Sequence, residues 1–137
     1  LGTPVRDVVK FCGGLKPGTR EIVMGGPMMG RPIASLDVPI LKGCSGVLVF
    51  TEEQTARRKE YPCISCGRCL EACPYFLNPS RLARLSKSRM FDEMKAYNVF
   101  DCVECGCCTF ACPSNIPIVQ LIRTAKDDLT HRKEPDA

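Results

Sequence analysis

A cysteine pattern that occurs twice constrains this chain more than any other feature. The first copy reads Cys63-Ile-Ser-Cys66-Gly-Arg-Cys69-Leu-Glu-Ala-Cys73-Pro74, and the second reads Cys102-Val-Glu-Cys105-Gly-Cys-Cys108-Thr-Phe-Ala-Cys112-Pro113. Three thiols at two-residue gaps can each bind one iron of a cubic iron–sulfur cluster, and a remote fourth thiol must bind the last iron. The sequence therefore predicts two 4Fe-4S clusters.

The fourth thiol of each cluster is expected from the other copy of the pattern, as in ferredoxins that hold two clusters. The predicted ligands of cluster 1 are Cys63, Cys66, Cys69 and Cys112. The predicted ligands of cluster 2 are Cys102, Cys105, Cys108 and Cys73. Because each cluster would join two distant segments, we expect the second half of the chain to need its clusters in order to fold.

Two other uses of these cysteines are less consistent with the spacing. Zinc ribbons use paired C-x-x-C units, and not a run of three thiols followed by C-P. A disulfide scaffold needs an oxidising compartment, and nothing in the sequence has the pattern of a secretory signal. We therefore prefer iron–sulfur clusters to zinc or disulfides.

Three further cysteines lie outside this register. Cys107 is interpreted as a spare thiol beside the second cluster, and the alternative is a competing ligand. Cys12 and Cys44 are interpreted as buried free thiols, since buried cysteine behaves as a small apolar residue. The single histidine, His131, is expected to be solvated in the C-terminal tail.

Charge does not indicate a nucleic-acid partner. The formal net charge of the 137 residues is +4, but each oxidised cluster with its four thiolates would add about −2, and a bound ion belongs in any charge argument. A basic strip near the first motif fits either an acidic redox partner or an ordinary solvated helix face; it comprises Arg81, Arg84, Lys87 and Arg89. No apolar run approaches the roughly 18 residues of a membrane helix.

The predicted fold class is α+β, with a small first half. Thr3 is expected to cap a helix that has Pro4 at its first position and stops at Gly13-Gly14. Strands are expected at residues 20–24 and 46–50, the second buried on both faces. The glycine-rich stretch between them lacks the Lys and Ser/Thr of a phosphate loop and is interpreted as a structural turn.

The second half is expected to be helical. Thr51 and Gln54 would cap a linker helix over residues 51–61, and Asn78 would cap a helix with Pro79 at its first position. A further helix is expected from Met90 to Tyr97. The last begins at Pro117 with an apolar stripe made of Ile118, Leu121, Ile122, Ala125 and Leu129. The predicted domains are therefore residues 1–50 and 62–130, with a frayed tail at 131–137.

Both halves resemble RnfC, the peripheral cluster-bearing component of the Rnf electron transport complexes. In the first half the resemblance rests on Gly2-Thr3-Pro4-Val5, Phe11-Cys12-Gly13-Gly14, Met24-Gly25-Gly26-Pro27-Met28-Met29-Gly30, Leu36-Asp37-Val38-Pro39 and Lys42-Gly43-Cys44-Ser45-Gly46. In the second half it rests on the cysteine motifs, including Pro113-Ser114. The resemblance implies a soluble-ligand-binding β-grasp (SLBB) domain followed by an α-helical dicluster ferredoxin domain.

The family implies a peripheral subunit on the cytoplasmic side of the cell membrane. Its complex passes electrons between reduced ferredoxin and NAD and couples this to ion translocation, so the implied partners are the other subunits and a ferredoxin-like protein. FMN and NADH are expected on a region N-terminal to these residues. Since the chain starts at Leu1 without Met, we expect it to be part of a longer polypeptide that does not oxidise NADH through this segment alone.

Two alternatives remain open. The related cobalamin reductase of bacterial microcompartments shares the layout of a β-grasp domain followed by a dicluster domain. A module without redox function, in which the SLBB half binds a small ligand or a partner, is the second alternative.

Overall fold

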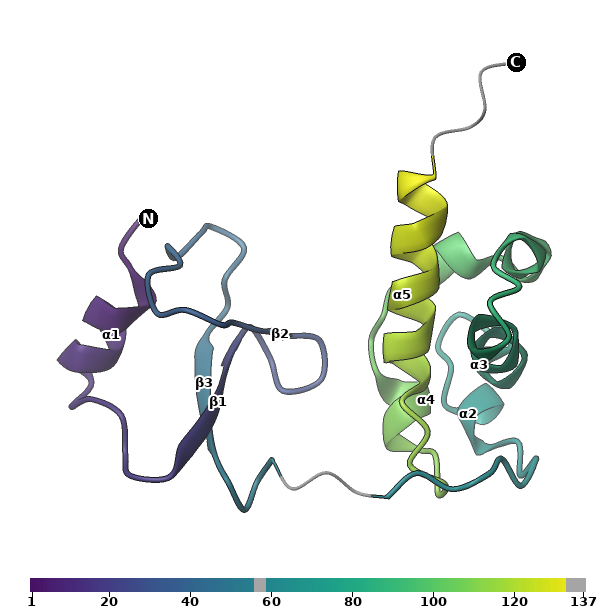
Figure 1. Ribbon diagram of the computed structural model, residues 1–137, viewed down its shortest axis with the longest axis horizontal. Coiled ribbons are helices and arrows are strands. Elements are labelled where there is room, and N and C mark those ends of the chain that lie inside the picture. The colour runs from purple at the N-terminus through teal and green to yellow at the C-terminus, as the bar shows by residue number, and fades with distance from the viewer. Residues whose placement is uncertain (56–58, 133–137) are drawn as a thin grey trace. The chain divides into compact units, whose positions relative to one another are not determined.

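The computed structural model describes residues 1–55 and 59–132 (Figure 1). The chain divides into two compact units, residues 1–57 and 58–137. The first contains one helix and a small antiparallel sheet, and the second is built from helices. Helices and an antiparallel sheet are thus both present, as the predicted α+β class requires.

Helix α1 (Val5–Phe11) begins differently from the prediction. Pro4, and not Thr3, occupies the capping position, and no side chain accepts a hydrogen bond there. Thr3 is instead paired in extended form, because its carbonyl accepts the backbone N–H of Ile40 at 2.9 Å. Val5 is fully buried directly after this pairing.

The sheet consists of β1 (Thr19–Met24), β2 (Arg31–Pro32) and β3 (Val47–Thr51), in the order β2-β1-β3 and antiparallel throughout. Both predicted strands are confirmed, but the expected burial of β3 on both faces is wrong. Val49 is 40% exposed, because β3 lies at the edge of a sheet of only three strands. The two-residue β2 was not predicted; it is a short edge strand, where proline is tolerated.

A glycine-rich turn connects β1 with β2. Gly25 has φ +107° and donates its N–H to the carbonyl of Gly46 at 2.8 Å. A Cβ on Gly30 would clash with Val23 Cγ1 and lie 2.5 Å from the carbonyl oxygen of Gly26. Gly25 is thus required by its backbone conformation and Gly30 by close packing, which agrees with the interpretation of this stretch as a structural turn.

The prediction of a linker helix is wrong for the described residues of that segment. Residues 52–55 form turns, and residues 59–61 have no regular structure. The Gln54 side chain does accept the N–H of Thr51 at 2.9 Å, but the chain does not continue as a helix. The rest of the prediction, with Arg57 and Arg58, lies outside the described residues.

The second unit contains the same structural repeat twice. Its elements are α2 (Arg68–Glu71), α3 (Pro79–Lys87), the 3₁₀ helices η1 (Asp92–Tyr97) and η2 (Val99–Asp101), α4 (Cys107–Phe110) and α5 (Ile118–His131). Helices α4 and α5 begin 39 residues after α2 and α3. Left-handed backbone recurs at the same offset, at Ser65 and Glu104, Gly67 and Gly106, and Phe76 and Asn115.

The helix ends in this unit largely follow the prediction. Asn78 caps α3, because its Oδ1 accepts the N–H of Arg81 at 3.0 Å. The helix expected at Met90 begins at Asp92 and is of the 3₁₀ type. Helix α5 continues through His131, one residue into the predicted tail, and His131 is exposed as expected. Residues 133–137 lie outside the described part of the chain.

A hydrophobic core lies between α3, α5 and the 3₁₀ helices. It comprises Leu82, Ala83, Leu85, Phe91, Met94, Val99, Cys108, Ile116, Ile118, Val119, Ile122 and Ala125. The Ser86 hydroxyl donates to the carbonyl of Leu121 at 2.7 Å and links α3 to α5. Within residues 1–55, by contrast, Val5 and Val23 are the buried apolar side chains.

Candidate iron–sulfur sites

The first site is a cavity of about 430 Å³ lined by four thiols. These are Cys63, Cys66 and Cys69 from the first motif together with Cys112 from the second. Cys63 and Cys66 are exposed, whereas Cys69 and Cys112 are half-buried. The structure therefore brings together the four thiols that were predicted to hold cluster 1.

The second site is narrower, with a volume of about 20 Å³. Its thiols are Cys102, Cys105 and Cys108 from the second motif together with Cys73 from the first. Leu82 and Ile122 line its inner side, so this site lies directly against the hydrophobic core. The grouping is again the predicted one, and iron ligation by the individual thiols stays a prediction.

Hydrogen bonds explain why Cys112 lies with the first motif. The segment before Cys63 is tied to the segment after Cys112: the N–H of Tyr61 donates to the carbonyl of Ser114 at 2.9 Å. The Ser114 hydroxyl donates to the carbonyl of Pro62 at 3.0 Å. Ser114 itself is buried. These contacts hold two segments together that are about 50 residues apart in the sequence.

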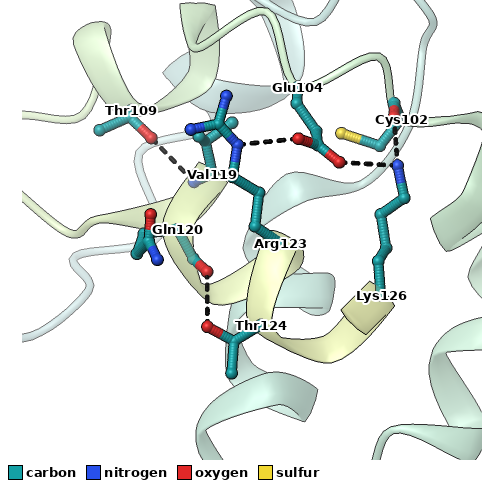
Figure 2. A network of polar contacts seen from close by, with 8 residues as sticks. All are labelled: Cys102, Glu104, Thr109, Val119, Gln120, Arg123, Thr124 and Lys126. Atoms are coloured by element: carbon teal, nitrogen blue, oxygen red, sulfur yellow. Dashed lines mark hydrogen bonds and ion pairs between the residues drawn. The ribbon is translucent and has the colours of Figure 1, made fainter. Parts of the chain in front are cut away.

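Glu104, between the first two cysteines of the second motif, is held by two cations of α5 (Figure 2). Arg123 Nε donates to its Oε2 at 2.8 Å, and Lys126 Nζ donates to its Oε1 at 2.9 Å. Lys126 also donates to the backbone carbonyl of Cys102 at 2.9 Å. All three side chains are about one-fifth exposed. The sequence reading missed this network, although the 39-residue offset between the motifs relates these positions to Ser65, Arg84 and Lys87.

The charge state of Glu104 follows from these contacts. Burial alone would raise the pKa of its carboxyl group, but the hydrogen bonds from Lys126 and Arg123 outweigh it and hold the pKa below its usual value. The group is therefore a carboxylate at neutral pH.

The thiols nearest the core are poor acids. Burial, with a smaller contribution from the neighbouring Cys102 and Cys105, raises the pKa of Cys108 to about 11. Burial likewise raises the pKa of Cys69 and of Cys102. Since metals bind thiolates, iron binding at either site must release protons at neutral pH.

The spare thiols have different surroundings. Cys107 is half-buried, and a hydrogen bond with Cys105 raises its pKa. Cys12 is exposed, so the expected burial is wrong for it, because α1 ends there and turns toward solvent. Cys44 is half-buried and donates its S–H to the carbonyl of Gly46 at 3.2 Å. Cys12 and Cys44 line a third cavity of about 430 Å³ within the first unit.

The basic strip is not one uniform face. Arg81 is half-buried and stacks over the ring of Tyr97 at 5.5 Å. Arg84 and Lys87 line the first cavity, and Lys87 forms an ion pair with Glu60.

Within the described residues, no three His, Cys, Asp or Glu side chains lie close enough to bind a single metal ion.

Comparison with known proteins identifies the second unit. Residues 60–116 match the family model of the 4Fe-4S dicluster domain. The four-thiol sets of both sites are the donor chemistry that such clusters require. Residues 60–116 thus form a 4Fe-4S dicluster domain, which supports two 4Fe-4S clusters as the predicted cofactors.

Curated relatives extend the similarity to nearly the whole chain, and each is the C component (RnfC) of its complex. That of the proton-translocating ferredoxin:NAD(+) oxidoreductase complex of Clostridium ljungdahlii is 51% identical over 93% of this chain and 28% of its own length. That of the ion-translocating oxidoreductase complex of Rhodobacter capsulatus is 44% identical over 97% of this chain and 26% of its own. The C component of the Na(+)-translocating ferredoxin:NAD(+) oxidoreductase complex of Acetobacterium woodii is 41% identical over 94% of this chain and 29% of its own length. The chain thus spans less than a third of these relatives.

Proposed function

We propose that this chain relays electrons through its two clusters. It is similar along nearly its whole length to the RnfC components of ion-translocating ferredoxin:NAD oxidoreductase complexes. The relay would be one part of a complex that moves electrons between ferredoxin and NAD and couples them to ion translocation. The observation that carries the proposal is the grouping of eight thiols into two sites of four, each with three thiols from one motif and one from the other.

The residues of this chain would perform two tasks in such a relay. A 4Fe-4S cluster, when bound, accepts and donates one electron at a time. The thiolates would hold each cluster, with Cys63, Cys66, Cys69 and Cys112 at the first site and Cys102, Cys105, Cys108 and Cys73 at the second. Buried side chains such as Leu82 and Ile122 would keep water from the inner side of the second site.

The first unit is proposed to be an SLBB β-grasp domain, over about residues 1–50, that connects the dicluster domain to the rest of a longer polypeptide. Its helix and antiparallel sheet, and the turn at Gly25 to Gly30, are compatible with this assignment. An SLBB module that binds a small ligand is the second candidate. It is favoured by the largely apolar cavity that Val8, Ile40 and Val47 line together with Cys12 and Cys44.

The proposed location is the cytoplasmic face of the membrane, with other subunits of the complex and a ferredoxin-like protein as partners. No helix in residues 1–55 or 59–132 combines the length and the apolar character needed to cross a bilayer. FMN and NADH would bind to other parts of the longer polypeptide. The alternative is a fragment of the cobalamin reductase type, and reduction of cob(II)alamin by that longer polypeptide would distinguish it.

Metal analysis after anaerobic reconstitution tests the proposal. We expect about eight iron and eight sulfide per chain, since each cluster holds four irons, and an electron paramagnetic resonance (EPR) signal on reduction. Stoichiometric zinc without visible absorption would contradict it.

A further inference from the structure

The two repeats of the dicluster domain differ in charge at the position between their first two cysteines. The 39-residue offset relates Arg84 and Lys87 on α3 to Arg123 and Lys126 on α5, so each repeat carries the same pair of cations on its longer helix. Within the cysteine motif, however, the second repeat has Glu104 where the first has Ser65. The fold thus contains two versions of one site, and only one of them has a carboxylate at this position of its motif.

At the second site the carboxylate is fixed in place. Glu104 accepts hydrogen bonds from Arg123 and Lys126 at 2.8 and 2.9 Å, and the same Lys126 ammonium holds the carbonyl of Cys102. The side chains are only about one-fifth exposed, so water screens their charges less than at an open surface.

At the first site the corresponding cations lie at the cavity. Arg84 and Lys87 line it, and Lys87, which is exposed, pairs with Glu60, which precedes the motif. The serine at position 65 carries no charge. The cation pairs are therefore matched, but the first motif has no negative charge between its first two cysteines.

We infer that Glu104, clamped by Arg123 and Lys126, is a positioning residue that lowers the reduction potential of the second cluster. A negative charge two residues from Cys102 and next to Cys105 disfavours the addition of an electron, and outer contacts of this kind tune metal sites. The clamp also fixes the backbone between these two cysteines through the carbonyl of Cys102. The inference rests on the proposed electron relay.

The test uses the full chain with both clusters and measures iron content first, then both midpoint potentials by EPR-monitored titration. In Glu104→Gln, which keeps the size of the side chain, we expect iron to be retained, one midpoint to rise and the other to stay. In the reciprocal Ser65→Glu, we expect the other midpoint to fall. Asp92→Asn is the control: it removes an exposed carboxylate that pairs with Arg132 in the same unit, and both midpoints should stay.

The outcomes separate this inference from the proposed function. A wild-type chain that binds no iron would overturn the relay itself. Full iron content with both midpoints unchanged in Glu104→Gln would overturn the inference and leave Glu104 a purely structural role. If Glu104→Gln does not assemble the second cluster, Ser65→Glu decides, because it leaves the Glu104 clamp intact: a lowered midpoint supports the inference and an unchanged one overturns it.

Discussion

The backbone N–H of Val119 donates a hydrogen bond to the hydroxyl of Thr109 at 2.9 Å. Val119 lies in the first turn of α5, whose capping position is held by Pro117 without a side-chain cap. Thr109 lies in α4, between Cys108 and Cys112. A residue of the second cysteine motif thus caps the longest helix of the dicluster domain, and motif and helix stabilise one another.

Thr109→Val should therefore lower the free energy of unfolding of the second unit by about 1 kcal/mol, the usual cost of losing a helix cap. Urea unfolding of the cluster-loaded chain, followed by circular dichroism, measures it. Thr124→Val is the matched control, because the Thr124 hydroxyl bonds to the Gln120 carbonyl of its own helix at an exposed position; its effect should stay within about 0.5 kcal/mol. Equal effects of both substitutions would argue against the cap.

Crossed ligation predicts an exchange of effects between the motifs. Cys73→Ser should disturb mainly the cluster of Cys102, Cys105 and Cys108, because Cys73 lines the second site. Cys112→Ser should disturb mainly the cluster of Cys63, Cys66 and Cys69. Selective loss of one EPR signal in each variant is the measurement. If each substitution abolishes the cluster of its own motif, the assignment is wrong.

Removal of the clusters should loosen the motifs before it unfolds the helices. The sequence suggested that the second half needs metal to fold, but the core between α3 and α5 is made mostly of apolar side chains other than cysteine. After chelation we expect protease cleavage between Cys63 and Cys69, with part of the helical circular dichroism retained.

In that cluster-free chain, Leu82→Ala should reduce the remaining helical signal to that of α1 in the first unit, because truncating a fully buried leucine costs about 2–5 kcal/mol. Leu70→Ala, at a 39% exposed position in α2, is the control. A chain that loses the helical signal of its second unit on chelation alone would show that the metal, and not the core, carries the fold of that unit.

The turn between β1 and β2 offers a test of the first unit. Gly30→Ala should destabilise that unit, because the added methyl group would collide with Val23 and with the carbonyl of Gly26. Gly26→Ala introduces the same group where no atom lies within 4 Å and is the control. Hydrogen exchange of the β1 amides would report the difference, and similar exchange in both variants would contradict the packing argument.

The parts that the sequence predicted well depend on local chemistry. Asn78 before Pro79 is a strong helix start, and the spacing of apolar residues after Pro117 is that of an amphipathic helix. The cysteine spacing similarly predicted three thiols of each group, and the analogy with ferredoxins that hold two clusters supplied the fourth.

The parts that it missed depend on tertiary contacts. Thr3 is a good capping residue, but its backbone is drawn into a pairing with Ile40 that no local pattern reveals. The Thr51–Gln54 contact forms, yet a capping signal alone does not supply the apolar face that a helix packs on. Predicting the contacts of Glu104 with Arg123 and Lys126 required knowing that α5 returns to the second motif. The 39-residue offset alone nevertheless relates these three positions to Ser65, Arg84 and Lys87.

The exchange of the fourth thiol between the repeats determines how much of the chain is needed to complete one cluster site. Each repeat carries four cysteines in the motif register, but the structure places its last one, Cys73 or Cys112, at the site of the other repeat. A chain with a single repeat would therefore present three thiols to its own cluster and one to a neighbour. Two identical copies related by a two-fold axis would complete both sites, so a half-length chain with this cysteine pattern would need a second copy to complete either cluster.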